Sequence, residues 1–394
     1  MLLASTTANA LNYLYTLLMS RSLGLEGYGS VVALFALIGI AAVPTGVVQN
    51  VVVDATARLA AQGLGTRAGA LLRVALVRLV ALYGVTLALI LTGSTYLARF
   101  LQLPEPSLVT WAGLALFCAG LAPAALGVLQ GLQRFPSLGL TTVLGPLAKL
   151  GVGVALVGLG WGVHGAVVGA VAGAALALAT ALFFVPAGWM ARLREPVVFL
   201  TPTSWRLAGN LMAFTGLLNL DVLLVKHYLA PSEAGLYAAA STGGKVLLFM
   251  TGAIPAVLFP QVITLHTRGQ AAEAYRVLQR ALGYTLILIA PALAVYWAAP
   301  ALVMQLLFGQ AYVGAAPLLR PLALGMAGFA VVGALLTYQV GRQRFDCLPW
   351  LAAGAVAEAL GVVALRGEAA WVPYVLIVVA AALTWVLWRL AVRR

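Results

Sequence analysis

Long apolar runs, separated by short polar turns, make up nearly the whole chain. A helix needs ~20 mostly apolar residues to cross the hydrocarbon core of a bilayer. The pattern therefore predicts an all-α, polytopic membrane protein with about twelve transmembrane helices. The expected spans are 3–22, 30–53, 76–98, 108–130, 138–160, 165–187, 207–229, 236–262, 281–300, 316–340, 348–365 and 370–390.

Two stretches of the chain share one arrangement of polar and apolar positions. One stretch is Asn219–Val262, and the other lies near the N-terminus. In each, a helix with polar residues ends at a cation (Arg21 or Lys226), a turn with a glutamate and a glycine follows, and the next helix carries a proline. An offset of half the chain is typical of the internal repeats of secondary transporters. We therefore expect two six-helix lobes, residues 1–190 and 207–394, joined by a cytoplasmic linker at 191–206.

Glycine and proline positions predict how some of these helices pack and bend. Gly165, Gly169 and Gly173 recur every four residues, which allows a neighbouring helix to approach closely. Pro255, inside the expected span 236–262, removes a backbone donor and predicts a bend. Backbone groups freed at membrane depth are tolerated only where protein or a wet cavity satisfies them.

Composition supports the membrane assignment. Hydrophobic residues make up 63% of the chain and charged residues 8%, whereas soluble domains carry ~25% charged residues. The mean hydropathy is +1.03. The net charge of +13 comes from cations placed singly between apolar spans, so no nucleic-acid partner is expected.

The cations also predict the orientation in the membrane. With the N-terminus inside, the inner loops and the tail hold sixteen arginines, and the outer side receives only Arg21, Arg99, Lys226 and Arg366. Such an asymmetry follows the positive-inside rule. Both termini are therefore expected in the cytoplasm.

Three cations fall inside the expected spans: Lys149, Lys245 and Arg320, with Arg21 at the outer end of the first span. A charge at mid-bilayer costs ~2.5–3.5 kcal/mol on insertion scales, so such residues usually face a bundle interior or a wet cavity. Only two acids oppose them inside the spans. This excess of positive charge predicts a cavity for an anion, with phosphate or pyrophosphate as the expected group. The alternative is that each cation reaches an interface or pairs with one acid.

The two intramembrane acids are Asp221 and Glu358. Carboxylates at membrane depth commonly serve as proton or ion relays. Asp221 and Glu358 are therefore candidates for loading and releasing a coupling proton or sodium ion. The competing role for Asp221 is a structural ion pair with Lys245 or Lys226.

Other chemistry finds little support in the sequence. Asn9 and Asn12 on the first helix could bind sugar hydroxyls, although bonding between helices is an equal alternative. His164, His227 and His266 have no second ligand at metal-binding spacing. No nucleophile–base grouping is visible. We therefore expect neither a metal site, nor a bound cofactor, nor an enzyme.

Short motifs in both halves resemble those of a known family. The turn Arg21–Gly24 followed by Tyr28-Gly29 resembles the R-x-L-G-x-x-x-Y-G turn of polysaccharide flippases of the Wzx type. These flippases belong to the multidrug/oligosaccharidyl-lipid/polysaccharide exporter superfamily. The second half is similar to the family's seventh and eighth helices at Asp221–Val225, Ala234–Ala239, Lys245 and Phe259-Pro260.

The resemblance implies a MATE-like or flippase-like fold with two lobes around a cation-lined cavity. It implies translocation of an undecaprenyl-pyrophosphate-linked oligosaccharide by alternating access, driven by an ion gradient, for cell-surface polysaccharide biosynthesis. The implied location is a bacterial or archaeal cytoplasmic membrane, and the implied partners are membrane lipids, a polysaccharide polymerase and chain-length proteins.

Two other functions remain open at this point. The first is an ion-coupled multidrug or small-molecule antiporter of the same superfamily, which would favour a cavity of acids and aromatic residues. The second is a membrane-embedded polysaccharide polymerase or ligase, which would need a sizeable outer loop, whereas the outer turns here are short.

Overall fold

Helices account for every regular element of the computed structural model, which describes residues 2–64, 68–185, 202–365 and 368–392. The prediction of an all-α membrane fold is confirmed. The helices form two compact units, unit 1 from Met1–Leu23 and Leu37–Ala208, and unit 2 from Gly24–Ala36 and Gly209–Arg394. Most of the expected linker, 191–201, lies outside the described residues.

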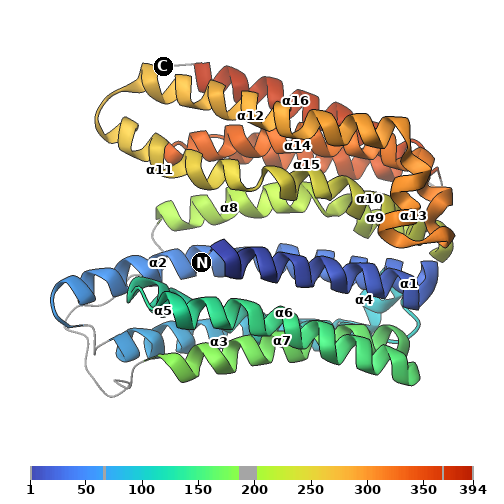
Figure 1. The fold of residues 1–394 in the computed structure, drawn as a ribbon, viewed down its shortest axis with the longest axis horizontal. Helices are drawn as coiled ribbons and strands as arrows, with labels where there is room; N and C mark the ends of the chain where they lie inside the picture. Colours follow the sequence, from blue (N-terminus) through green and yellow to red (C-terminus); the bar gives the residue numbers. More distant parts are fainter. Residues whose placement is uncertain (1, 65–67, 186–201, 366–367, 393–394) are drawn as a thin grey trace. The chain divides into compact units, whose positions relative to one another are not determined.

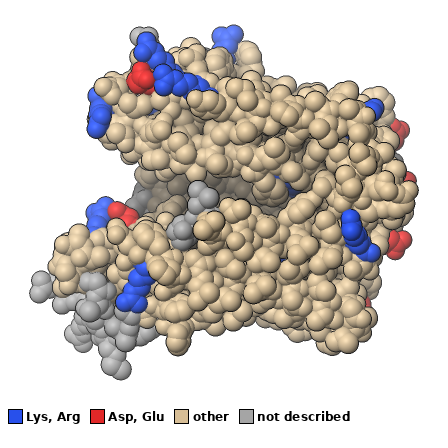
Figure 2. All heavy atoms as spheres, in the orientation of Figure 1, with Lys and Arg blue, Asp and Glu red and all other residues tan. Residues whose placement is uncertain are grey.

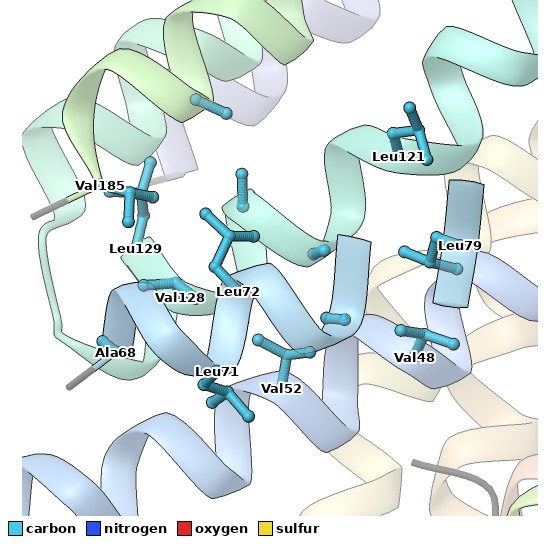
Figure 3. Close-up of a cluster of buried hydrophobic side chains, with 14 of the residues drawn as sticks. Val48, Val52, Ala68, Leu71, Leu72, Leu79, Leu121, Val128, Leu129 and Val185 are labelled. Carbon is cyan, nitrogen blue, oxygen red and sulfur yellow. The ribbon is translucent and has the colours of Figure 1, made fainter. Parts of the chain in front are cut away.

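Unit 1 is built around helices that pack side by side (Figure 1). Figure 3 shows its buried core, in which Val52 of α2, Leu72 of α3 and Leu129 of α5 lie together. All three side chains are 0% exposed. The helices of the first half are α1 Leu2–Ala41, α2 Val43–Ala61, α3 Ala68–Thr92, α4 Ser94–Phe100, α5 Ser107–Gly131, α6 Phe135–Leu156, the π-helical turn η2 Val157–Trp161 and α7 Gly162–Phe184.

Helices α6 and α7 form a tight hairpin. Gly160 and Gly162 adopt positive φ angles of 90° and 51°, which turn the chain back on itself. A Cβ atom added at Gly169 would lie 2.6 Å from Cα of Gly153, and one at Gly173 would lie 2.7 Å from the carbonyl oxygen of Gly145. The predicted glycine ladder on α7 is confirmed as a close packing surface.

Unit 2 contains the helices of the second half together with Gly24–Ala36. The Tyr28 ring packs against the Tyr312 ring at a centroid distance of 5.8 Å, and the Tyr312 hydroxyl donates to the Gly24 carbonyl at 3.0 Å. Its helices are α8 Pro202–Leu217, α9 Leu220–Tyr228, α10 Pro231–Thr251, α11 Ala253–Thr267, α12 Ala271–Ala298, α13 Pro300–Phe308, the 3-10 helix η3 Gln310–Ala315, α14 Ala316–Gly341, α15 Leu348–Ala364 and α16 Val372–Val392.

Length and hydropathy alone give fewer membrane spans than the sequence pattern. Seven helical runs of the described residues are long and apolar enough to cross a membrane, or up to nine if each of two bent pairs is one span. Two of the seven contain a break, at Gly24 in Leu3–Ala41 and at Gly160–Gly162 in Phe135–Phe184. A helix covers most of each of the twelve expected ranges. Twelve crossings therefore stay a prediction.

One of the two bent pairs, α10 and α11, lies where Pro255 predicted a bend, and the break between α8 and α9 falls inside the single span expected at 207–229. α8 and α9 meet at 43°, and α10 and α11 meet at 42°. Pro255 falls in the first turn of α11, where its missing N–H leaves no bond unmade.

Candidate functional site

The break between α8 and α9 places two polar residues at the start of α9. Asn219 has a non-helical φ of −135°, and Asp221 lies in the first turn of α9. Interrupted helices at membrane depth are tolerated where their polar groups are buried in protein or line a cavity. Ion and substrate sites of transporters are often built at such breaks.

Asp221 is 0% exposed and is held by side chains of α10. Its Oδ2 accepts a hydrogen bond from the Tyr237 hydroxyl at 2.9 Å and a second from Ser241 Oγ at 3.2 Å. Tyr237 and Ser241 are four residues apart, so both point from one face of α10. The Asp221 carboxylate is therefore fixed between α9 and α10.

Lys245 lies one further turn along the same face of α10 and is half-buried. Its Nζ donates to Oδ1 of Asn219 at 3.1 Å. The Asn219 amide nitrogen in turn donates to the Thr215 carbonyl at 2.8 Å, which fixes the amide oxygen as the acceptor. Lys245 and Asp221 are electrostatically coupled but do not come within the 4.0 Å of a direct ion pair.

Glu358 of α15 completes this cluster from a third helix. It is 0% exposed, and neither carboxylate oxygen makes a hydrogen bond within 3.5 Å to any residue that the structure describes. α9 packs against both α10 and α15, so Glu358 interacts electrostatically with Asp221 and Lys245. Two carboxylates and one ammonium group leave one excess negative charge if all are ionised. A bound proton or monovalent cation would balance that charge.

Unit 1 contains a half-buried cation, Lys149 of α6. The half-buried Lys149 side chain places Nζ 3.4 Å from Oδ1 of Asn12 and 4.2 Å from the centroid of the Tyr15 ring. The Tyr15 hydroxyl donates to the Ala166 carbonyl of α7 at 2.8 Å. Because the Asn12 amide nitrogen bonds the Ala8 carbonyl at 3.0 Å, its oxygen is turned towards the lysine.

The close α6–α7 packing holds the backbone of Lys149 in place. A Cβ atom added at Gly169 would lie 2.8 Å from the Lys149 carbonyl oxygen, and one at Gly173 would lie 2.8 Å from the Lys149 Cβ. The glycines therefore fix the base of the lysine, while Asn12 and Tyr15 fix its ammonium group.

The structure brings some of the predicted site residues together and leaves others apart. Asp221, Glu358 and Lys245 share one cluster, and Asn12 contacts Lys149. The residues Asn9, Arg21 and Arg320 are exposed, and their roles in binding stay predictions. Of the alternatives for Asp221, a direct ion pair within 4.0 Å forms with neither Lys245 nor Lys226.

Four partners of these groups were not predicted: Asn219, Tyr237, Ser241 and Tyr15. The spacing of Tyr237, Ser241 and Lys245 at every fourth residue could have indicated a polar stripe on one helix face. No group of three or more His, Cys, Asp or Glu side chains at metal-binding distance occurs in the described part of the chain.

Comparison with solved structures places the fold among transporters. An inward-facing multidrug resistance MATE family transporter of the MOP superfamily matches with a TM-score of 0.70 at 15% identity, covering 98% of each chain. The lipid II flippase MurJ, in an inward closed conformation, matches with a TM-score of 0.73 at 11% identity, covering 98% of this chain and 86% of that one. A MOP superfamily transporter from Pyrococcus furiosus matches with a TM-score of 0.61 at 16% identity, covering 99% of this chain and 93% of that one.

Sequence comparison identifies the family. No curated protein sequence matches the chain significantly. A family profile described as "Polysaccharide biosynthesis protein" matches residues 18–317, which is most of the chain. The resemblance predicted from the short motifs is thereby confirmed. The chain belongs to the polysaccharide biosynthesis protein family and shares its fold with membrane transporters and flippases.

Proposed function

We propose that the protein is a flippase that moves an undecaprenyl-pyrophosphate-linked oligosaccharide across the cytoplasmic membrane by alternating access. The family membership supports a role in polysaccharide biosynthesis. Lipid-linked oligosaccharides are assembled on the inner leaflet and must reach the outer one, so such a pathway needs a carrier for a large, negatively charged headgroup.

The observation that carries this proposal is a half-buried lysine fixed by an asparagine in each unit. Lys149 and Lys245 each donate to a neutral amide oxygen, which positions the ammonium group, and Lys245 also interacts electrostatically with Asp221 and Glu358. An ammonium group has three donors, and the bond to Asn219 uses one of those of Lys245. Charge-assisted hydrogen bonds of this kind contribute ~1.5–3 kcal/mol each.

The Asp221–Glu358 cluster is the proposed site of ion coupling. Both carboxylates are buried, and the Glu358 oxygens make no hydrogen bond within 3.5 Å in the described part of the protein. A proton or a sodium ion bound there would neutralise the cluster, and its release would restore a buried negative charge. We expect the two states to favour different arrangements of α9, α10 and α15, because burying an unpaired charge is costly.

The two alternatives differ in what they require of the site. A multidrug antiporter for cationic compounds would bind its substrate at acids and aromatic residues. The Asp221–Glu358 cluster of unit 2 is acidic, whereas the site in unit 1 places a cation, Lys149, beside an amide and a phenol ring. The Pyrococcus furiosus transporter is described as having a binding pocket of reversed polarity that suggests a different function. Pocket charge is thus a reasonable basis for separating functions within this fold. A polymerase or ligase would need a catalytic grouping, such as a nucleophile with a base, as well as a sizeable outer loop.

The proposed orientation places both termini in the cytoplasm, and the proposed host is a bacterium or an archaeon. A polysaccharide polymerase and chain-length proteins are proposed as downstream partners, because the flipped unit must be consumed on the outer side. Membrane lipids surround the helices.

Deletion of the gene followed by complementation tests the proposal. In the deletion strain, we expect the lipid-linked oligosaccharide to accumulate on the cytoplasmic face and surface polysaccharide to be lost. The native chain should restore both, and a chain carrying Lys149→Gln and Lys245→Gln should not. Normal surface polysaccharide in the deletion strain, together with increased sensitivity to cationic drugs, would favour the antiporter instead.

A further inference from the structure

A pocket of about 380 Å³ lies between α12, α14 and α16 of unit 2, away from the Asp221 cluster. Its polar lining comes from Tyr275, Arg276 and Gln279 of α12 and from Tyr338 and Arg342 of α14. Small side chains at the start of α12 and the end of α16 supply the remaining wall. Two guanidinium groups thus line a pocket of this size with no acid among its lining residues.

Arg342 is held in the pocket by its surroundings. Its Nη1 donates to the Ala391 carbonyl at 3.3 Å and to the Tyr338 hydroxyl at 3.4 Å, and the guanidinium lies 5.3 Å from the Tyr338 ring centroid. A guanidinium has five N–H donors, and within the described residues the hydrogen bonds of Arg342 use those of Nη1. The remaining donors suit a second acceptor such as a phosphate.

Arg276 supplies the second positive charge and is more exposed. Its side chain is 68% exposed and forms an ion pair with Glu273 at 3.2 Å. Because an exposed pair one helical turn apart is weak, Glu273 offsets Arg276 only in part. Arg276 therefore remains available to an anion that enters the pocket.

The pocket lies where α12 begins and where α14 and α16 end. Arginines gather where α12 begins and α14 and α16 end (Figure 2), the end predicted to face the cytoplasm. Aromatic rings lie there too, with Tyr275 and Trp388 at a centroid distance of 5.9 Å. Along α12, Leu286 lies two turns beyond Gln279 on the same face and is 58% exposed. A polar pocket is therefore continuous with an apolar, lipid-facing surface.

We propose that this pocket binds the phosphate headgroup of an anionic phospholipid of the surrounding membrane. Arg276 and Arg342 contact the phosphate, Gln279 and the Tyr275 hydroxyl contact the polar part of the headgroup, and an acyl chain follows the exposed face of α12. Basic pockets between transmembrane helices at the cytoplasmic side recognise anionic lipids in this way. The charge and the apolar continuation together favour a lipid over a free anion. This site is independent of the proposed flippase function.

Lipid retention by the purified, delipidated full chain tests the proposal. Native mass spectrometry would compare dioleoylphosphatidylglycerol with dioleoylphosphatidylcholine on the native chain and on Arg276→Gln/Arg342→Gln. An arginine near an anionic lipid surface contributes about fivefold in binding, so the double variant should retain the anionic lipid about twenty-five-fold less. The zwitterionic lipid should bind weakly to both.

Three comparisons keep the result specific. The control Arg268→Gln/Arg389→Gln removes two exposed charges from the same end without touching the pocket, and it should retain the anionic lipid normally. The single variant Arg276→Gln keeps the contacts of Arg342 to α16, and it should retain the anionic lipid about fivefold less than the native chain. The proposed site would be overturned if the native and double-variant chains retained the anionic lipid equally. It would also be overturned if the control variant lost as much lipid as the double variant. Stabilisation of the native chain by inorganic phosphate alone, with no added effect of the lipid, would assign the pocket to a free anion and overturn the lipid.

Discussion

Nζ of Lys245 donates to Oδ1 of Asn219 at 3.1 Å, and both residues belong to unit 2. The same pairing occurs in unit 1, where Lys149 donates to Asn12 at 3.4 Å. Both asparagines bond the carbonyl four residues earlier through their amide nitrogen, and they lie about half the chain apart. Each unit therefore holds one lysine by a neutral acceptor, and in unit 2 the carboxylates of Asp221 and Glu358 also act on that lysine.

Replacing these asparagines by aspartate should stop transport of an anionic cargo. Asn12→Asp and Asn219→Asp keep the side-chain shape, lose the amide donor to the Ala8 or Thr215 carbonyl, and place a carboxylate beside each lysine, so each ammonium group becomes part of an ion pair. We expect each variant to slow flipping by about tenfold or more, since a charged hydrogen bond to the cargo contributes ~1.5–3 kcal/mol. Initial flipping rates in reconstituted vesicles measure the effect.

Asn50→Asp is the matched control, because Asn50 of α2 is exposed. It introduces the same charge and should flip at the native rate. Native rates in Asn12→Asp and Asn219→Asp would show that the lysine charges do not act on the cargo.

Neutralising the buried acids should uncouple transport from the ion gradient. In Asp221→Asn the amide oxygen can still accept from Tyr237 and Ser241, so the fold is expected to persist. Glu358→Gln removes the second carboxylate. Both variants should lose the response of the flipping rate to imposed proton or sodium gradients, measured in vesicles with each gradient separately.

Glu233→Gln provides the comparison for that experiment, because Glu233 is exposed on α10 and should leave the gradient response intact. Full activity of Asp221→Asn with an unchanged response to pH and sodium would end the coupling role of this cluster.

The charged residues of the site were visible in the sequence, but their partners were not. Lys149, Lys245 and Asp221 stand out because charges are rare within apolar runs. A serine or tyrosine in a helix gives no comparable signal, so Tyr237 and Ser241 were missed. Whether a cation is buried or exposed also depends on which face its helix presents. The sequence therefore did not separate exposed Arg320 from half-buried Lys149.

The division into units was only partly predictable. The apolar runs of the sequence assign most helices to the first or the second half of the chain. They do not predict which unit a turn packs against. Gly24 adopts a φ of 67° and interrupts α1, after which Gly24–Ala36 belongs to unit 2. The reason is local packing: the backbone of Gly29 comes so close to Gly235 that an added Cβ would lie 3.0 Å from its Cα.

Adding a methyl group at the α6–α7 contact should destabilise the protein and weaken transport together. The methyl group of Gly169→Ala would push α7 away from the backbone of Gly153 and Lys149 on α6. Overpacking of this kind costs ~1–3 kcal/mol. Thermal unfolding in detergent should show a lower midpoint, and flipping should slow because Lys149 shifts.

Gly151→Ala on the same hairpin is the control, because a Cβ there meets nothing within 4 Å. It should leave the unfolding midpoint unchanged or slightly raised, since alanine favours a helix over glycine. Equal midpoints for the two variants would mean that α6 and α7 are not packed closely at Gly169.

Cys347, in the turn between α14 and α15, should resist alkylation in the folded protein. Burial raises the pKa of its thiol from 9.0 to about 12, and the negative charge of Asp346 adds to the shift. The reactive thiolate at neutral pH is therefore about a thousandfold scarcer than for an ordinary thiol. In a Cys118→Ser background, maleimide labelling should be slow until the chain unfolds. Prompt, complete labelling of the folded chain at pH 7 would contradict this burial.

Flipping of a pyrophosphate-linked oligosaccharide lipid in reconstituted vesicles tests the central claim most directly. The comparison is between the native chain, Lys149→Gln/Lys245→Gln and Arg99→Gln, the last of which removes an exposed charge at the end of α4. The account predicts at least about tenfold slower flipping in the double lysine variant and a native rate in the control. An equal rate for all three chains, with the folded structure retained, would contradict it.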